Sequence, residues 1–191
     1  MTSTQEKLRV VAISGSLRKE SMNRKALQIA KRFASQAGVI VEEMDLKELD
    51  IPVFDQDIMD QGMPESVQRL KLAVKEAEVI IIASPEYNYS VPGGLKNAID
   101  WLSRGENSLE GKVAAIFGVS NGINGTIRMQ PQLKIILNSL NVSLVPQPQV
   151  MIRNGREAFT PEGGLVDSKL EAQLKMLIEK TLHLAKAMKE Q

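Results

Sequence analysis

The chain has 191 residues, of which 43% are hydrophobic and 25% are charged, as is ordinary for a globular protein. Its net charge of +1 excludes a general attraction to nucleic acid or to an anionic membrane surface, so any anion site must be local. The absence of cysteine excludes disulfides, thiolate nucleophiles and thiolate metal ligands. We expect a single cytoplasmic domain over residues 1–191, with no signal peptide, no membrane span and no metal site.

Five segments have the apolar patterns of β-strands. Residues 8–14, 77–83 and 112–119 are short, continuous apolar runs, typical of central strands that are covered on both faces. Residues 39–46 alternate more, and residues 142–150 contain two prolines, which cannot donate to a strand ladder. The second and fifth strands are therefore expected at the edges of the sheet.

Helical patterns separate and follow these strands. A helix is also expected near residues 127–137, where many apolar residues surround Arg128. Four other segments place apolar residues on one helical face: Met22, Ala26, Ile29, Ala30 and Phe33; Val67, Leu70 and Val74; Leu95, Ala98, Ile99 and Leu102; and Leu170, Leu174, Leu177, Ile178 and Ala185.

Alternating strands and helices predict an α/β fold, a doubly wound parallel sheet with helices on both faces. Two strand orders fit, the flavodoxin-like 2-1-3-4-5 and a Rossmann-type arrangement, and the edge character of the second and fifth strands favours the first. Ligands bind such sheets at the carboxyl ends of the strands near the switch point. For order 2-1-3-4-5 these are the loops after strands one, three and four.

The loop after the first strand has the composition of a phosphate site. Ser16, Ser21 and Asn23 supply hydroxyl and amide donors, and Arg18 supplies a planar guanidinium. The next helix starts with basic residues, although its dipole favours negative charge there, so a bound anion would restore favourable electrostatics. The alternative interpretation is that Ser21 only caps the helix and Arg18 is solvated.

The loop after the third strand contains the only two tyrosines of the chain, Tyr87 and Tyr89. They flank Asn88, and the Pro-Gly-Gly sequence that follows stiffens the loop and permits close approach of its backbone. Beside a phosphate site, this pattern suits a flat, hydrogen-bonding ring. The alternative is an aromatic loop packed on its neighbours or across a subunit interface.

The loop after the fourth strand reads SNGING, residues 120–125. Its small residues leave backbone amides free to bond the carbonyl oxygens of a ligand. A plain glycine turn is the alternative. Three such loops at the three expected positions favour a ligand site.

Two motifs also carry a likeness to a known family. GSLRKxSxN, from Gly15 to Asn23, and PEYNYSVPGxLKNAIDWLSR, from Pro85 to Arg104, strongly resemble the NADPH-dependent FMN reductase family of flavodoxin-like proteins, and in particular its bacterial quinone and chromate reductase branch. The resemblance spans nearly the whole chain. One departure is Gly125-Thr126, where many relatives have two glycines.

The resemblance implies FMN as cofactor and NADPH or NADH as co-substrate. It implies that the FMN phosphate is held by Ser16, Arg18, Ser21 and Asn23, with Leu17, Lys19, Glu20 and Met22 lining the same loop. It also implies that the isoalloxazine lies along Pro85, Glu86, Tyr87 and Asn88. Ser120 and Gly122 would face the far side of that ring. Hydride would pass from nicotinamide to flavin, and a small-molecule acceptor would then replace the nicotinamide. No catalytic residue is assigned: Glu86 is expected to fix its loop, and the single histidine, His183, is expected to be structural.

We expect the physiological electron acceptor to be a quinone. Chromate, azo dyes, nitro compounds and free flavin are the other acceptors that the resemblance allows. Relatives form homodimers and homotetramers, which is the expected assembly here, and Leu49–Met59 is expected either to wall the site or to join a subunit contact. Two rival functions stay open. The first is a flavodoxin-type electron carrier, which would typically be acidic; the second is a protein that binds a phosphorylated metabolite.

Overall fold

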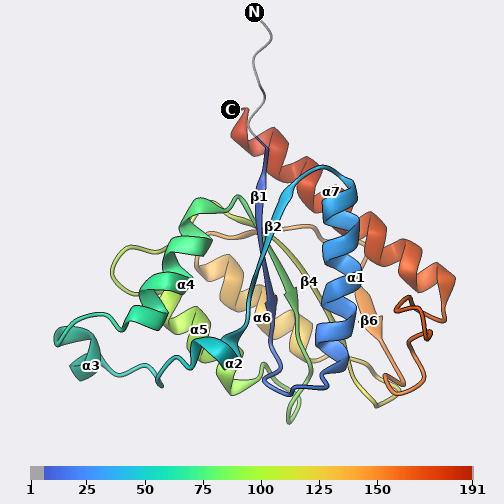
Figure 1. Ribbon diagram of the computed structural model, residues 1–191, viewed down its shortest axis with the longest axis horizontal. Helices are drawn as coiled ribbons and strands as arrows, with labels where there is room; N and C mark the ends of the chain where they lie inside the picture. Colours follow the sequence, from blue (N-terminus) through green and yellow to red (C-terminus); the bar gives the residue numbers. More distant parts are fainter. Residues whose placement is uncertain (1–6, 191) are drawn as a thin grey trace, which may run out of the picture.

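In the computed structural model, which describes residues 7–190, one parallel sheet is covered by helices on both faces (Figure 1). The order β2-β1-β3-β4-β5 confirms the flavodoxin-like expectation, and a further strand, β6, pairs with β4. The strands are β1 (Arg9–Ser14), β2 (Ile40–Met44), β3 (Val79–Ala83), β4 (Val113–Val119), β5 (Ser143–Leu144) and β6 (Val150–Ile152).

Two apolar cores lie on opposite faces of the sheet. Alternate residues of one strand enter different cores, so that Val10 and Ala12 of β1 pack on one face while Val11 and Ile13 pack on the other. This is why the central strands are continuous apolar runs.

The helices are α1 (Met22–Gln36), α2 (Leu46–Leu49), α3 (Gln56–Asp60), α4 (Glu65–Glu76), α5 (Gly93–Ser103), α6 (Met129–Ser139) and α7 (Ser168–Lys189).

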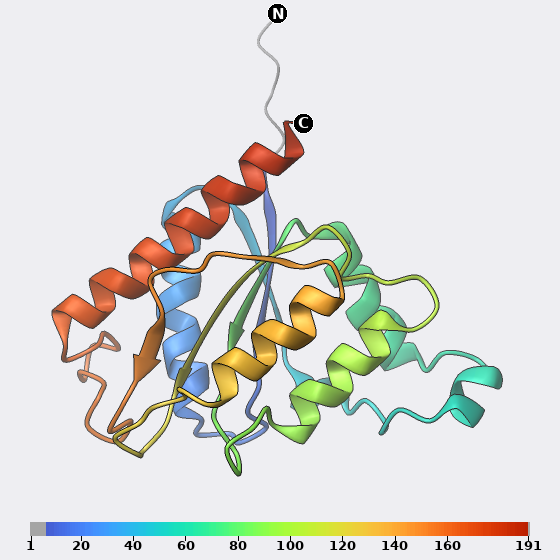
Figure 2. The same ribbon diagram turned by 180° about the vertical axis from the view of Figure 1, so that it is seen from behind.

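The two layers of helices are distinct. Helices α1 and α7 contribute to the first core, whereas α4, α5 and α6 contribute to the second (Figure 2). Within residues 7–190, no helix combines the length and the apolar character needed to cross a membrane.

The fifth position of the sheet is occupied by two short strands instead of the single strand expected over residues 142–150. Strand β5 pairs with the start of β4 at Val113 and Ala114, and β6 pairs with its end from Phe117 to Val119. The segment between them contains Pro146 and Pro148. Because proline has no N–H to donate, the ladder is interrupted there and resumes beyond it.

The carboxyl ends of β1, β3 and β4 bring three loops to one edge of the sheet. Close backbone approach makes this convergence possible, since a Cβ added at Gly118 would lie 2.0 Å from the carbonyl oxygen of Ser84. A Cβ added at Gly15 would lie 2.6 Å from the Ser84 hydroxyl oxygen. Glycine is therefore required at both positions for the loops to meet.

The segment that carries α3 projects from the body of the molecule (Figure 1), and α3 itself contains no buried residue. Its base is fixed to α5: Asn97 Nδ2 and Trp101 Nε1 both donate to the carbonyl oxygen of Pro52 at 2.8 Å. The Phe54 ring packs edge-on against Trp101, with 4.9 Å between ring centroids. Val53 is 80% exposed. This segment does not line the cavity between the three loops.

Candidate functional site

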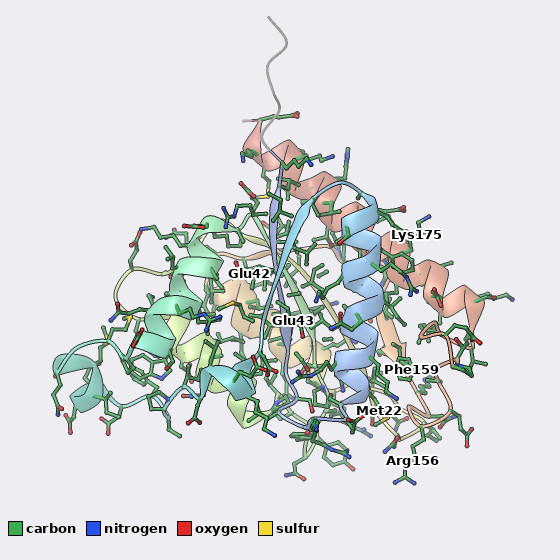
Figure 3. The ribbon with its side chains drawn as sticks, viewed as in Figure 1. Met22, Glu42, Glu43, Arg156, Phe159 and Lys175 are labelled. Carbon is green, nitrogen blue, oxygen red and sulfur yellow. The ribbon has the colours of Figure 1, made fainter. Side chains whose placement is uncertain are left out.

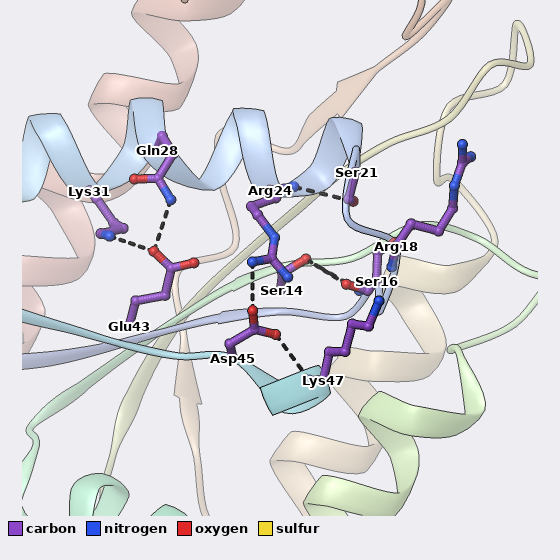
Figure 4. Close-up of polar contacts among 10 residues, drawn as sticks. All are labelled: Ser14, Ser16, Arg18, Ser21, Arg24, Gln28, Lys31, Glu43, Asp45 and Lys47. Carbon is purple, nitrogen blue, oxygen red and sulfur yellow. Dashed lines mark hydrogen bonds and ion pairs between the residues drawn. The ribbon is translucent and has the colours of Figure 1, made fainter. Parts of the chain in front are cut away.

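The loop after β1 is shaped by its own serines. Ser14 Oγ accepts a hydrogen bond from the Ser16 N–H at 3.3 Å, and Ser16 Oγ accepts one from the Arg18 N–H at 3.4 Å (Figure 4). Ser21 caps α1, accepting from the Arg24 N–H at 3.3 Å. Ser16 and Ser21 are buried, whereas the Arg18 side chain is exposed. The loop thus lines the cavity with the exposed Arg18 side chain and with two buried hydroxyl groups.

The basic start of α1 is partly neutralised by β2. Arg24 Nη1 lies 2.6 Å from Asp45 Oδ2 (Figure 4), and the hydrogen bond that Arg24 donates to Asp45 raises the pKa of Arg24 against the effect of burial. Burial acts to raise the pKa of Asp45, but the hydrogen bond from Arg24 and backbone N–H donors bring it below its ordinary value. Arg24 is therefore committed to Asp45, while among residues 7–190 no ion pair involves Arg18.

The Asn23 side chain joins the start of α1 to the end of β4. Its Nδ2 donates to the carbonyl oxygen of Val119 at 3.0 Å, and its Oδ1 accepts from the Val119 N–H at 2.8 Å. Asn23 is only 3% exposed. The bridge uses one of the two N–H groups of the amide, and Asn23 also lines the cavity between the loops, so the phosphate contact expected from the sequence stays a prediction. Within the fold, Asn23 positions the loop.

The tyrosine loop is a tight turn held by α6. Tyr87 and Ser90 exchange backbone hydrogen bonds of 3.1 and 3.0 Å, and Asn88 and Tyr89 have positive φ values of 49° and 65°. Gln132 Nε2 donates to the Tyr89 carbonyl at 2.6 Å. The Arg128 guanidinium carbon lies 4.2 Å from the centroid of the Tyr89 ring. Tyr89 thus packs on its neighbours, and Tyr87 is left at the cavity.

Glu86 fixes this loop to the start of α6, as expected. Its Oε2 accepts hydrogen bonds from the N–H groups of Arg128 and Met129 at 2.9 and 3.0 Å. Its side chain is 9% exposed. The residue that precedes α6 gives no side-chain cap, so a carboxylate from another loop satisfies the orphan donors.

Replacing Glu86 with alanine is expected to lower the free energy of unfolding by about 1–2 kcal/mol, the usual cost of losing a helix cap with buried donors. Chemical denaturation followed by circular dichroism measures this. Glu162→Ala is the matched control because Glu162 is exposed and precedes no helix. Equal stability of the two variants would contradict the capping role.

The loop after β4 is also internally bonded. Ser120 Oγ accepts from the Gly122 N–H at 3.2 Å, and the Ser120 carbonyl accepts from the Gly155 N–H at 3.1 Å. One of the backbone amides expected to face a ligand is therefore engaged within the loop. The neighbouring Asn121, which the sequence did not single out, reaches the cavity.

A cavity of about 210 Å³ lies between the three loops. Four expected residues, Leu17, Lys19, Asn88 and Gly122, do not line it, and Glu20 lines a neighbouring cavity. The lining residues are Ser16, Arg18, Ser21, Met22, Asn23, Pro85, Glu86, Tyr87, Val119, Ser120 and Asn121. Val119 and Asn121 were missed because a strand end and a small polar loop residue carry no distinctive sequence signal.

This fold and cavity define a flavodoxin-like α/β protein with a ligand site at the switch point of its sheet. The model of the NADPH-dependent FMN reductase family matches residues 8–157, and the chain belongs to this family. The expectation of an NAD(P)H-dependent FMN oxidoreductase, taken from the two motifs, is confirmed at the level of the family.

Individual relatives agree with this assignment. The chain is 42% identical over 163 residues to an NAD(P)H-dependent FMN reductase of Pseudomonas aeruginosa, covering 85% of this chain and 86% of that protein. It is 38% identical over 177 residues to a quinone reductase of Escherichia coli, covering 91% and 87%. The solved structure of the flavoenzyme NAD(P)H:(acceptor) oxidoreductase FerB from Paracoccus denitrificans superposes with a TM-score of 0.85 at 31% identity, covering 95% of this chain and 98% of that one.

Proposed function

We propose that this chain is an FMN-dependent oxidoreductase that takes electrons from NAD(P)H and passes them to quinones. The observation that carries the proposal is the cavity between the three loops, which is lined by Arg18 and by two buried hydroxyl groups at the start of a helix with no acid in its first turn. These donors suit a phosphate monoester.

The residues present fit FMN. Ser16, Ser21 and Arg18 offer hydroxyl and guanidinium donors for the phosphate, assisted by the positive end of the α1 dipole. Tyr87 and the Pro85-Glu86 backbone would lie along the isoalloxazine, with Ser120 across from them. When bound, FMN supplies the redox chemistry, accepting a hydride from NAD(P)H and delivering electrons to the acceptor.

The protein's own contribution is binding and orientation. Glu86 is occupied at the start of α6, and His183 is exposed on α7, away from the three loops. Hydride transfer needs no general acid or base, so no catalytic residue is proposed.

Quinone is the proposed acceptor because relatives covered over most of their length are named quinone reductases. Chromate, azo dyes and free flavin are proposed as further acceptors. We also propose a single cytoplasmic domain that assembles as a homodimer or homotetramer. Exposed apolar side chains around α6, Ile127 at 47% and Ile135 at 70%, support the assembly.

The electron-carrier alternative is less well supported, since carriers of this fold are typically acidic and this chain has a net charge of +1. A site for a phosphorylated metabolite would account for Arg18 and Ser16. It would not explain why the turn from Tyr87 to Ser90 is fixed to α6 beside the cavity. Both alternatives are outcomes of the same experiment.

The experiment is a visible spectrum of the protein after incubation with FMN and removal of the excess. NADPH or NADH is then added without oxygen, followed by 1,4-benzoquinone. Retained flavin that bleaches quickly and regains its absorbance with the quinone is the expected result. Retained flavin that stays yellow would favour the electron carrier, and no retained flavin would favour the phosphorylated-metabolite site.

A further inference from the structure

A second cavity, of about 540 Å³, adjoins the first on the other side of the start of α1. The two cavities share Arg18, Met22 and Asn121. We call the second one the basic pocket, because Arg18, Lys25 and Arg156 line it against a single acidic side chain, that of Glu20. Figure 3 shows Met22, Phe159 and Arg156 together beside the first turn of α1.

Among residues 7–190, the cations of the basic pocket lack the carboxylate partners that the other basic residues of α1 have. Away from the pocket, Arg24 pairs with Asp45, Lys31 with Glu43, and Arg32 with Glu171. In contrast, within the described part of the chain no ion pair involves the three basic side chains of the pocket, Arg18, Lys25 and Arg156. Cations gathered around one cavity without carboxylate partners are suited to an anionic ligand.

The outer wall of the pocket is held in place and contains an aromatic ring. Gly155 N–H donates to the Ser120 carbonyl at 3.1 Å, which fixes this wall to the loop after β4. Beyond it, Thr160 and Gly164 close a turn through a 3.0 Å backbone hydrogen bond. Phe159 lies in this wall, and Lys25 Nζ is 6.0 Å from its centroid. An aromatic face beside cations can accept a stacked base next to a phosphate.

FMN has one phosphate, which the proposed function places in the smaller cavity. An anion held in the basic pocket would then belong to another molecule. Of the dinucleotide and the quinone in the proposed reaction, only the dinucleotide carries phosphates.

We propose that the basic pocket binds the adenosine 2′-phosphate end of NADPH, with Arg156 and Lys25 as phosphate contacts and Phe159 beside the adenine. A phosphomonoester carries roughly two negative charges at neutral pH, so three cations without carboxylate partners in the described chain attract it strongly. The neutral 2′-hydroxyl of NADH gains no such attraction. The pocket would therefore select NADPH over NADH. This inference rests on the proposed function.

The test compares Arg156→Ala with the unaltered protein, both loaded with FMN. The KM for NADPH is expected to rise roughly 10- to 100-fold, as for loss of a charge-assisted contact, and the KM for NADH by less than about threefold. Arg156→Lys should recover part of the loss, since it restores the charge without the planar fork. Arg69→Ala is the control, because Arg69 is an exposed arginine on α4 that lines neither cavity.

A direct binding measurement accompanies the kinetics. Adenosine 2′,5′-bisphosphate is titrated into the FMN-loaded protein by calorimetry, with ADP as the comparison. The bisphosphate should bind more tightly than ADP, and Arg156→Ala should remove that difference. Equal rises in both KM values would show that Arg156 contacts the pyrophosphate common to both dinucleotides, and would overturn the 2′-phosphate assignment, as would equal binding of the two probes.

The dinucleotide preference of the basic pocket and the oxidoreductase activity are tested separately. If FMN is retained and NADH bleaches it but the preference for NADPH does not depend on Arg156, only the basic-pocket inference is wrong. If neither dinucleotide bleaches the flavin, the proposed oxidoreductase itself is wrong. Arg156 is chosen for this test because Arg18 lines both cavities and would confound them.

Discussion

Replacement of Asn23 with alanine is expected to lower the free energy of unfolding by on the order of 3 kcal/mol. The substitution removes two hydrogen bonds, of 3.0 and 2.8 Å, and leaves the N–H and C=O of Val119 without these partners in a buried environment. For a chain of this length, the thermal midpoint should fall by roughly 10 °C. Differential scanning calorimetry measures both quantities.

The control for Asn23 is Asn138→Ala, which makes the same exchange within a helix at an exposed position. Helix propensity then changes alike in both variants. The difference between their free energies of unfolding therefore measures the contribution of the hydrogen bonds between Asn23 and Val119. FMN affinity should also fall in Asn23→Ala, because the loop after β1 is no longer held to β4. A thermal midpoint equal to that of the control would mean that the bridge does not stabilise the fold.

Arg18→Ala is expected to weaken FMN binding roughly 10- to 100-fold, since a charge-assisted contact to phosphate contributes about 1.5–3 kcal/mol. The folded state should be little affected, because the side chain is exposed and forms no ion pair among residues 7–190. Quenching of flavin fluorescence gives the dissociation constant, with Arg69→Ala as the control for the loss of one positive charge.

Riboflavin separates the phosphate contact from other roles of Arg18, because it has the same ring and side chain without the phosphate. Its affinity should change by less than about threefold in Arg18→Ala. An FMN dissociation constant equal to that of the unaltered protein would show that Arg18 is solvated, as the alternative interpretation of the first loop holds.

The fold follows closely from local patterns in the sequence. Continuous apolar runs mark β1, β3 and β4 because both faces of these strands are buried, and such burial leaves a clear signal. The prolines of residues 142–150 indicated an edge. They did not reveal that the edge is divided into β5 and β6, because β4 continues as a template beyond the interruption.

The donors of the first loop were visible in the sequence, since Ser16, Ser21 and Arg18 are neighbours in the chain, and their contact with a phosphate stays a prediction. The roles of Asn23 and Arg24 were not visible. Asn23 pairs with a residue 96 positions away, and Arg24 with one 21 positions away. The sequence indicated Asn23 as a donor and a basic start to this helix, but it could not show the partners that the sheet places beside Asn23 and Arg24.

What the sequence determined by itself is the order of the elements and the donors available at the carboxyl edge, because periodicity and loop composition are local properties. Only the fold shows which polar groups have partners within the protein. Packing bonds the Asn23 amide to Val119 and the Glu86 carboxylate to the start of α6, and it leaves Arg18, Lys25 and Arg156 around one cavity. The physical reason is that hydrogen bonds and ion pairs between distant segments depend on how the sheet brings loop ends together.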